Sequence, residues 1–434
     1  MARSVQHRPN PLLPKKPGRR GAFKDFRERE QTGLTRRLVA CLRCRMHKTR
    51  CLPDLANPHG CCMTCKNAFG SAILRPICVR KKVTEAKLFV KGTHPQFIWS
   101  RRWNSMKIVN ITRWANPEVK TIYVTQDVAG LSYSLRVRQF ILEPGDSDRR
   151  TWKTRGREMF YKCNNYAIED MEQTGRDVVQ FADNSIKGFI DHYIDKSDPL
   201  LHQTYLMALR YTDTDANLVR TTLRLWVAIR MESKSERICG HECLGQPPQN
   251  YDPECHNYGQ VLVPPVMSAQ IELIATATLL NPSKEFVLRS LRKLIEANKT
   301  RAWFTIYLCL FILLHSCALL TEFENRQARK YGKSTRYVYE NFVKELHHGS
   351  TILLSYFHYC NKGSHPLLMD WESSPDVHLA GLNEEQREFL KQSSELVKDK
   401  AHHFTHIRRN GKFEDPYFFL AQLYDSHWEP VRTI

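Results

Sequence analysis

The 434-residue chain lacks the short motifs that mark common enzyme classes. It has no G-x-S-x-G nucleophile elbow, no phosphate-binding P-loop, no Rossmann glycine pattern and no H-E-x-x-H motif. Residues 1–8 also lack the apolar segment of a secretory signal, so we expect the cysteine thiols to meet a reducing compartment. These absences give no positive support for catalysis, and we predict that the protein is not an enzyme.

Acidic residues are scarce at the start of the chain. The first 100 residues contain 22 Lys and Arg against 5 Asp and Glu, whereas the remaining 334 contain 43 against 40. Residues 1–38 are rich in Pro, Arg and Lys, which predicts a disordered basic arm, and the run at 15–20 is of the nuclear-import type. A basic head on a nearly neutral body favours a polyanionic partner, nucleic acid before an anionic membrane.

Long apolar runs are also rare, with one exception. The segment Trp303–Leu320 is almost wholly apolar and about long enough to span a bilayer. His315 and Ser316 interrupt it and aromatic residues are mixed through it, so we interpret it as a buried helix of an all-α body and expect no membrane partner. A membrane-tethered regulator is the alternative.

What the head does contain is cysteine. Seven of the 14 cysteines lie between Cys41 and Cys78, and the others are scattered from Cys163 to Cys360. In a reducing compartment such a cluster favours metal over disulfides. Six of the seven give the pattern C-x2-C-x6-C-x10-C-x2-C-x12-C: Cys41, Cys44, Cys51, Cys62, Cys65 and Cys78. Six thiolates can complete two four-ligand zinc sites if two of them bridge both ions.

This pattern resembles the fungal Zn2Cys6, or binuclear zinc cluster, family of transcription factors. The resemblance covers about residues 40–90 and is most specific in the stretch from Cys41 to Cys51, with its basic six-residue gap. It implies two zinc ions as cofactor, bridged by Cys41 and Cys62. It also implies two short helices, the first of which enters the DNA major groove.

The basic gap supplies the predicted DNA contacts. We assign Lys48 to base readout and Arg45 and Arg50 mainly to phosphates, with His47 as a titratable addition on the same short helix. A RING-like module would need a further C-x2-C pair, and none follows Cys78. A zinc-stabilised protein-interaction scaffold without specific DNA binding is the alternative function.

The pattern departs from the family in three places. Cys61 adjoins Cys62, and we choose Cys62 because it preserves C-x2-C with Cys65; Cys61 stays as the alternative ligand. The last gap, before Cys78, is longer than usual in the family. Leu52 also stands where an acidic residue is common.

The remaining chain predicts a small zinc-cluster head followed by a mainly α-helical regulatory body, with a short β meander between them. We place the DNA-binding domain at 39–92, the linker with short strands at 93–150 and the all-α domain at 151–434. The expected strands are Lys107–Thr112, Val119–Gln126 and Ser132–Leu142. Helical periodicity predicts helices at Met171–Ile194, Gln203–Tyr211, Leu218–Met231, Val266–Leu280, Lys284–Asn298, Arg301–Arg326, Tyr337–Asn361 and Asn383–Thr405.

Three further groups are weighed against ordinary structural roles. The Cys239, His241, Cys243, Cys255 and His256 group fits no zinc spacing, so we expect loop and packing residues. His315 is expected to be a satisfied core histidine. The acidic and aromatic tail at 413–430 is expected to cap the body, with co-activator contact as the alternative.

The predicted protein is therefore a nuclear, sequence-specific regulator of RNA polymerase II genes with double-stranded DNA as its partner. Transcription co-regulators and a homodimer are the further partners considered. Residues 83–110 show no sustained heptad, so the usual dimerisation coiled coil is not visible. Monomeric binding and dimerisation through the body both stay open.

Overall fold

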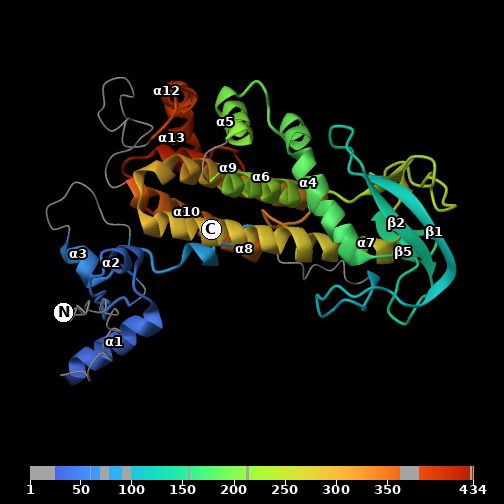
Figure 1. Cartoon of the computed structure of the whole chain (residues 1–434), viewed down its shortest axis with the longest axis horizontal. Coiled ribbons are helices and arrows are strands. Elements are labelled where there is room, and N and C mark those ends of the chain that lie inside the picture. The colour runs from blue at the N-terminus through green and yellow to red at the C-terminus, as the bar shows by residue number, and fades with distance from the viewer. Residues whose placement is uncertain are drawn as a thin grey trace, which may run out of the picture.

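The computed structural model describes residues 25–58, 60–68, 78–89, 99–154, 157–211, 215–361, 381–430 and 433. The cysteine-rich head and an antiparallel sheet lie at opposite ends of a long helical body (Figure 1). The run at 15–20 lies outside the described residues. The predicted arrangement of a small head followed by a mainly helical body is confirmed, and the strands belong to the body.

Helix α1 (Phe26–Leu38) occupies the end of the predicted basic arm. The Asp25 side chain accepts a hydrogen bond from the amide of Arg27 and caps the helix, which satisfies one of its free N–H groups. The prediction of a disordered arm was therefore wrong for residues 26–38, because composition does not show the cap and contacts that hold a helix with no buried residue. Glu28 accepts a hydrogen bond from Arg50 and the Thr35 hydroxyl donates one to the Cys51 carbonyl, and these contacts hold the helix to the cysteine-rich head.

The main sheet has five strands in the order β5-β2-β1-β6-β7. Its strands are β1 (Trp114–Thr125), β2 (Tyr133–Phe140), β5 (Tyr166–Ile168), β6 (Arg237–Cys239) and β7 (Val261–Leu262), and β3 (Arg149–Thr154) pairs with β4 (Arg157–Lys162) as a separate ribbon. The second and third predicted strands are confirmed as β1 and β2. The prediction for 107–112 was wrong, because this segment forms no ladder in the structure; the Trp103 indole N–H donates to the Val109 carbonyl instead.

The sheet does not end at residue 150. Strands β6 and β7 lie on either side of residues 240–260 and pair with each other, and β6 also pairs with β1, with Cys239 opposite Tyr123. The strands on one side of the sheet therefore come from residues that follow three helices of the body in sequence. It belongs to the body as one folded unit and is not a linker.

The helices follow the predicted periodicity closely. They are α4 (Met171–Tyr193), α5 (Pro199–Arg210), α6 (Ala216–Met231), α7 (Pro265–Ile274), the π-helical η3 (Ala275–Leu280), α8 (Asn281–Ala297), α9 (Trp303–Lys330), α10 (Glu340–Asn361), α12 (Glu384–Asp399) and α13 (Ala401–Arg409). The predicted last helix is broken at Lys400. Asn383 and Gln386 form a capping box at the start of α12.

Helix α9 lies at the centre of the body. It is long and apolar enough to cross a membrane, yet 94% of its most apolar window, of mean hydropathy 2.1, is buried inside the protein. His315 is buried with it and its Nδ1 lies 2.8 Å from the Tyr205 hydroxyl, as expected for a satisfied core histidine. These features are those of a core helix.

The C-terminal tail also packs on this core. The short helix η6 (Leu420–Tyr424) is wholly buried, and the buried Trp428 donates from its indole N–H to the side-chain oxygen of Gln422. The tail therefore caps the body, and its aromatic residues are used in packing.

Candidate metal centre and DNA-contact surface

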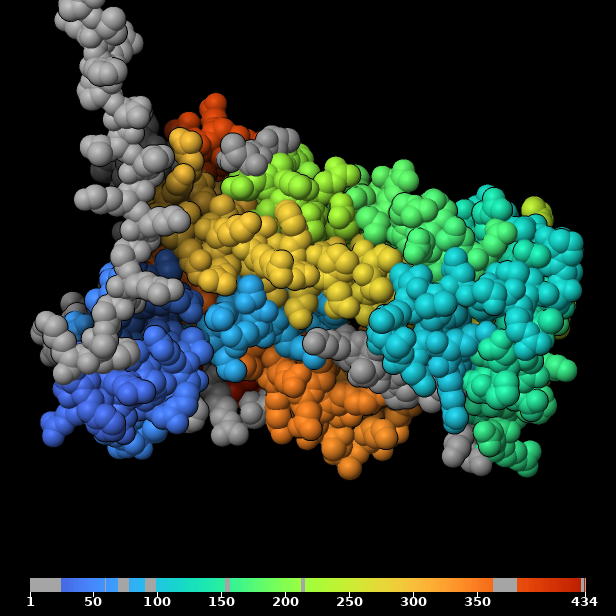
Figure 2. All heavy atoms as spheres, turned by 60° about the horizontal axis from the view of Figure 1, so that its bottom comes forward, coloured from blue at the N-terminus to red at the C-terminus, as the bar shows by residue number. Residues whose placement is uncertain are grey.

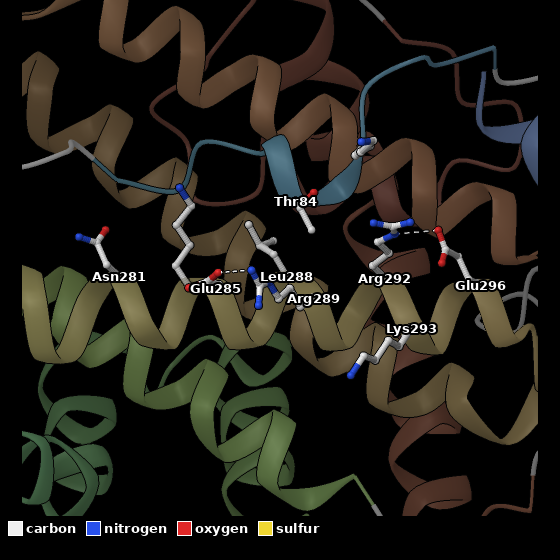
Figure 3. Close-up of a pocket in the computed structure, with 10 residues that line it drawn as sticks. Thr84, Asn281, Glu285, Leu288, Arg289, Arg292, Lys293 and Glu296 are labelled. Carbon is white, nitrogen blue, oxygen red and sulfur yellow. Dashed lines mark hydrogen bonds and ion pairs between the residues drawn. The ribbon is translucent and has the colours of Figure 1, made fainter. Parts of the chain in front are cut away.

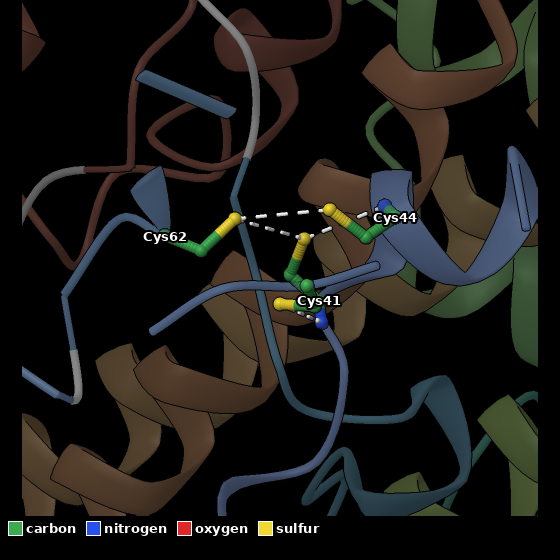
Figure 4. A group of neighbouring side chains, drawn as sticks. Cys41, Cys44 and Cys62 are labelled. Atoms are coloured by element: carbon green, nitrogen blue, oxygen red, sulfur yellow. Dashed lines mark hydrogen bonds between the residues drawn. The ribbon is translucent and has the colours of Figure 1, made fainter. Parts of the chain in front are cut away.

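Two groups of four cysteines form in the head, and they share two members. The Sγ atoms of each group lie within 4.8 Å of one another: Cys41, Cys44, Cys51 and Cys62 in the first, and Cys41, Cys62, Cys65 and Cys78 in the second. The shared sulfurs of Cys41 and Cys62 are 3.9 Å apart (Figure 4). The arrangement is thus two tetrads joined along one edge.

The spacing of these sulfurs suits zinc. In a tetrahedral site with Zn–S bonds of about 2.3 Å, neighbouring sulfurs lie about 3.8 Å apart. The Cys41–Cys65 and Cys44–Cys62 separations are 3.6 Å and 3.7 Å. Six soft sulfur donors, five of them buried, fit two tetrahedral metal ions with two bridging thiolates.

The two halves of the cluster repeat the same local structure. Cys41 is the N-cap of α2 (Leu42–Met46) and accepts a hydrogen bond from the Cys44 amide; Cys62 is the N-cap of α3 (Met63–Asn67) and accepts one from the Cys65 amide. The amides of Cys41 and Cys62 in turn donate to the sulfurs of Cys51 and Cys78. Both halves therefore use the helix N-terminus to stabilise negative sulfur.

This symmetry also distinguishes Cys62 from Cys61, the alternative ligand next to it in sequence. Cys61 belongs to neither tetrad, and its thiol lies 3.7 Å from the Cys62 carbonyl oxygen. Burial raises the pKa of Cys61 to about 12, so its thiol stays protonated. The geometry selects Cys62 as the residue that lines both tetrads, as the C-x2-C spacing predicted.

The thiols of the cluster cannot all ionise on their own. Hydrogen bonding among them, above all with Cys51, raises the pKa of Cys41 far above its usual value. The hydrogen bond with Cys41 lowers the pKa of Cys78 to about 2 and that of Cys51 to about 5. The thiolates of Cys51 and Cys78 are thus stabilised by protons on neighbouring thiols, and bound cations could take the place of those protons.

The four predicted DNA-contact residues lie on α2 and directly after it. Lys48 is exposed and adopts a left-handed backbone conformation, φ 53°, at the end of the helix. Arg50 is also exposed and pairs with Glu28 at 3.2 Å, so it is partly neutralised by α1. His47 is exposed and presents its ring to Tyr359 with centroids 6.4 Å apart.

Arg45 is placed differently from the prediction. Its Nη2 donates a 2.7 Å hydrogen bond to the Tyr356 hydroxyl on α10, and its Nε is buried. On the same face of α2, Leu42 is completely buried in the main core of the protein and Met46 packs against it. The predicted phosphate contact therefore takes part in docking the head on the body.

The segment after the cluster completes this docking. Residues 78–89 run between α8 and α10, with Val83 in η1 (Val83–Glu85) and Phe89 buried in the main core. Lys87 pairs with Glu345 of α10 at 3.2 Å. Figure 2 shows this light-blue segment lying against the gold helix α8 and the orange residues beneath it. The head is therefore held against the body by both α2 and the chain that follows the cluster.

Comparison with known proteins identifies the body. Residues 89–423 match the KpeA transcription factor family, which is most of the chain. The chain belongs to this family. A curated relative, the Satratoxin biosynthesis SC3 cluster transcription factor SAT20 of Stachybotrys chartarum, is 23% identical over 425 residues. The alignment covers 92% of this chain and 57% of that relative, so the chain spans little more than half of the relative's length. No solved structure matches.

The match places this chain in a family of transcription factors, and the relative's name is that of a fungal transcription factor. The region of the match starts at Phe89, the last described residue of the segment that runs from the cluster along the main core. The cysteine cluster lies before it. The family assignment rests on the body and the metal geometry on the head, so the two observations are independent.

Other cysteine and histidine groups of this KpeA-family chain do not gather in the same way. Among the described residues, the groups that place three or more metal-ligand atoms together are the two cysteine tetrads. Cys239, in β6, pairs with β1, and His241, Cys243, Cys255 and His256 follow in the loop before β7. His403, in α13, lies 3.2 Å from Asp415 at the surface.

Sequence reasoning missed two residues that hold the head in place, Arg80 within it and Tyr356 on the body. The Arg80 Nη1 donates to the Cys51 sulfur at 3.4 Å and to the Val39 carbonyl at 2.8 Å. Its place in the basic run after Cys78 was the available signal, because a cation beside a thiolate cluster offsets negative charge. Tyr356 gave no such signal, since it lies 311 residues from Arg45.

Proposed function

We propose that the protein is a zinc-dependent, sequence-specific DNA-binding regulator of RNA polymerase II genes that acts in the nucleus. The observation that carries this proposal is the pair of cysteine tetrads sharing Cys41 and Cys62. Two zinc ions held by six thiolates would leave the cluster with a formal charge of minus two, which Arg80 and the N-capping amides help to offset.

The reading residue in this proposal is Lys48. It stands exposed at the end of α2, and neither a carboxylate of the described residues nor a hydrogen-bond acceptor holds its ammonium group. A flexible ammonium in this position suits the O6 and N7 acceptors of guanine in the major groove. Arg50 and His47 would contact phosphates beside it, and Arg45 would hold α2 on the body.

The test is a binding-site selection on the full-length protein with and without a strong chelator. We expect two zinc ions per chain by elemental analysis and a selected sequence whose binding is lost with the metal. Lys48→Ala should keep both ions and weaken binding to the selected site by about 1–3 kcal/mol, with much less effect on unrelated DNA. An unchanged sequence preference would remove Lys48 from base readout.

A zinc-stabilised interaction scaffold is the second candidate, and the docking of α2 favours it. Leu42 and Arg45, on the helix that would read DNA, are occupied by the body. A scaffold would bind two zinc ions and show no selected sequence. The same experiment therefore separates the two functions, because only the DNA-binding protein shows zinc-dependent enrichment of one site.

A further inference from the structure

A cationic groove runs along the body next to the head. It lies between η1 and α8, has a volume of about 640 Å³ and is open to solvent. Its charged lining comprises Lys82, Lys284, Glu285, Arg289, Arg292, Lys293 and Glu296. Figure 3 shows Glu285, Arg289, Arg292 and Glu296 along α8, with Thr84 of η1 facing the helix across the groove.

The two carboxylates of the groove do not cancel its five cations. Glu285 pairs with Arg289 and Glu296 pairs with Arg292 at 2.8 Å, each one turn along α8. Lys82 and Lys293 have no carboxylate partner among the described residues. The groove therefore keeps a net positive charge, which attracts anions.

The cations are distributed along the helix and do not converge on one point. Lys284 and Lys293 are nine residues apart, a rise of about 14 Å along α8. A small anion could touch only part of this row. The phosphates of one DNA strand repeat about every 3.4 Å along the duplex axis, so an extended backbone could contact the whole row.

The groove also begins where α2 docks. Lys82 adjoins Lys81, whose carbonyl accepts a hydrogen bond from the Tyr356 hydroxyl at 3.3 Å, and the same hydroxyl binds Arg45. At this end of the groove, Arg292 lies close enough to Tyr356 to interact with it electrostatically. The docked face of α2 and the start of the groove therefore meet at Tyr356 of α10.

We propose that this groove binds the DNA phosphate backbone that flanks the base pairs contacted by α2. The inference rests on the proposed DNA-binding function and adds a second contact region supplied by the body. It predicts that the body increases affinity for long duplexes without changing which bases are preferred, since phosphate contacts carry no base identity.

The test uses the full-length, zinc-loaded protein and a K82Q/K293Q variant. Its control is K398Q/K412Q, which removes two exposed lysines on α12 and directly after α13, elements that Figure 1 places away from α8. Binding to the selected site is measured at several salt concentrations, on a minimal duplex and on duplexes extended by about one helical turn on either side.

We expect wild type and control to gain affinity when one flank is extended, and the groove variant to lose that gain. The slope of log K against log salt should be less steep by about 2 in the groove variant, because about two phosphate contacts are removed. The preference between selected and unrelated sequence should stay unchanged. Equal slopes and equal flank effects in all three proteins would overturn the inference.

Two other outcomes are distinguishable. If the wild type shows no zinc-dependent preference for one DNA sequence, the proposed function is wrong, whatever the groove variant does. If inorganic tripolyphosphate binds wild type and not K82Q/K293Q while the DNA slopes stay equal, the groove is a site for a soluble polyanion and the DNA assignment is wrong.

Discussion

The close approach of α10 to the segment after the cluster makes a sharp prediction for Gly349→Ala. A Cβ atom added at Gly349 would overlap the Lys87 carbonyl oxygen and lie 2.8 Å from the Lys87 amide nitrogen. Both atoms are backbone, so no side chain can turn away to make room. The two segments would have to separate by about 1 Å to restore ordinary contact distances of about 3.5 Å.

The expected cost follows from this displacement. Overpacking of this kind costs about 1–3 kcal/mol, and replacing a helical glycine with alanine returns about 0.5–1 kcal/mol. We therefore expect Gly349→Ala to lower the free energy of unfolding by up to about 2 kcal/mol. The displacement should also speed hydrogen exchange of the amides in residues 83–89, where Leu88 and Phe89 are each 5% exposed.

The control is Gly33→Ala, in helix α1, where no atom lies within 4 Å of the added Cβ. This variant should gain a little stability from helix propensity, and hydrogen exchange of the amides in residues 83–89 should stay unchanged. Urea unfolding followed by circular dichroism compares the two variants. If Gly349→Ala is as stable as Gly33→Ala and exchanges no faster, the head segment is not held against α10 as described.

Three further substitutions test the head and the core. Cys62→Ser should release bound zinc and reduce stability, whereas the neighbouring Cys61→Ser should keep the full metal content, as elemental analysis would show; equal metal loss would contradict the choice of Cys62. Tyr356→Phe should destabilise the docked head by about 1–3 kcal/mol, because a hydrogen bond from the Arg45 guanidinium is lost. Urea unfolding measures this loss against the control Tyr331→Phe, which changes an exposed and distant tyrosine; equal stability of the two variants would contradict the prediction. Burial lowers the pKa of His315 to about 3, so between pH 6.5 and that value the unfolded chain binds a proton that the folded chain does not. Stability should therefore fall by about 2 kcal/mol from pH 7 to pH 5 through this group, and His315→Gln should show a correspondingly flatter pH dependence in urea unfolding.

The parts that were predictable from sequence are those set by local spacing. The cysteine pattern anticipated which six sulfurs come together, because each C-x2-C pair spans the first turn of a short helix. The helices of the body were found by their apolar period. The sheet was only half found, since β6 has three residues and its partner β1 lies more than 100 residues earlier. No local pattern marks such a pairing.

The position of Arg45 shows the same limit at the candidate site. Sequence reasoning treated every cation in the gap between Cys44 and Cys51 as a DNA contact, because a basic helix carries no sign of which face is already occupied. Leu42, three residues before Arg45, is apolar and hinted that one face of α2 is buried. What it packs against depends on α10, more than 300 residues later.

The docking of the head also bears on how the body could influence DNA binding. In a protein whose zinc module hangs on a flexible linker, the body can act only through effective concentration. Here α2 and residues 78–89 both touch α10, so a displacement of that helix would move Lys48 relative to the groove on α8. Two contact regions with a fixed separation bind one duplex well only at one relative placement. If both surfaces bind DNA as proposed, regulation would need no separate switch in the head, because a shift of α10 alone would change the fit of both surfaces to the duplex.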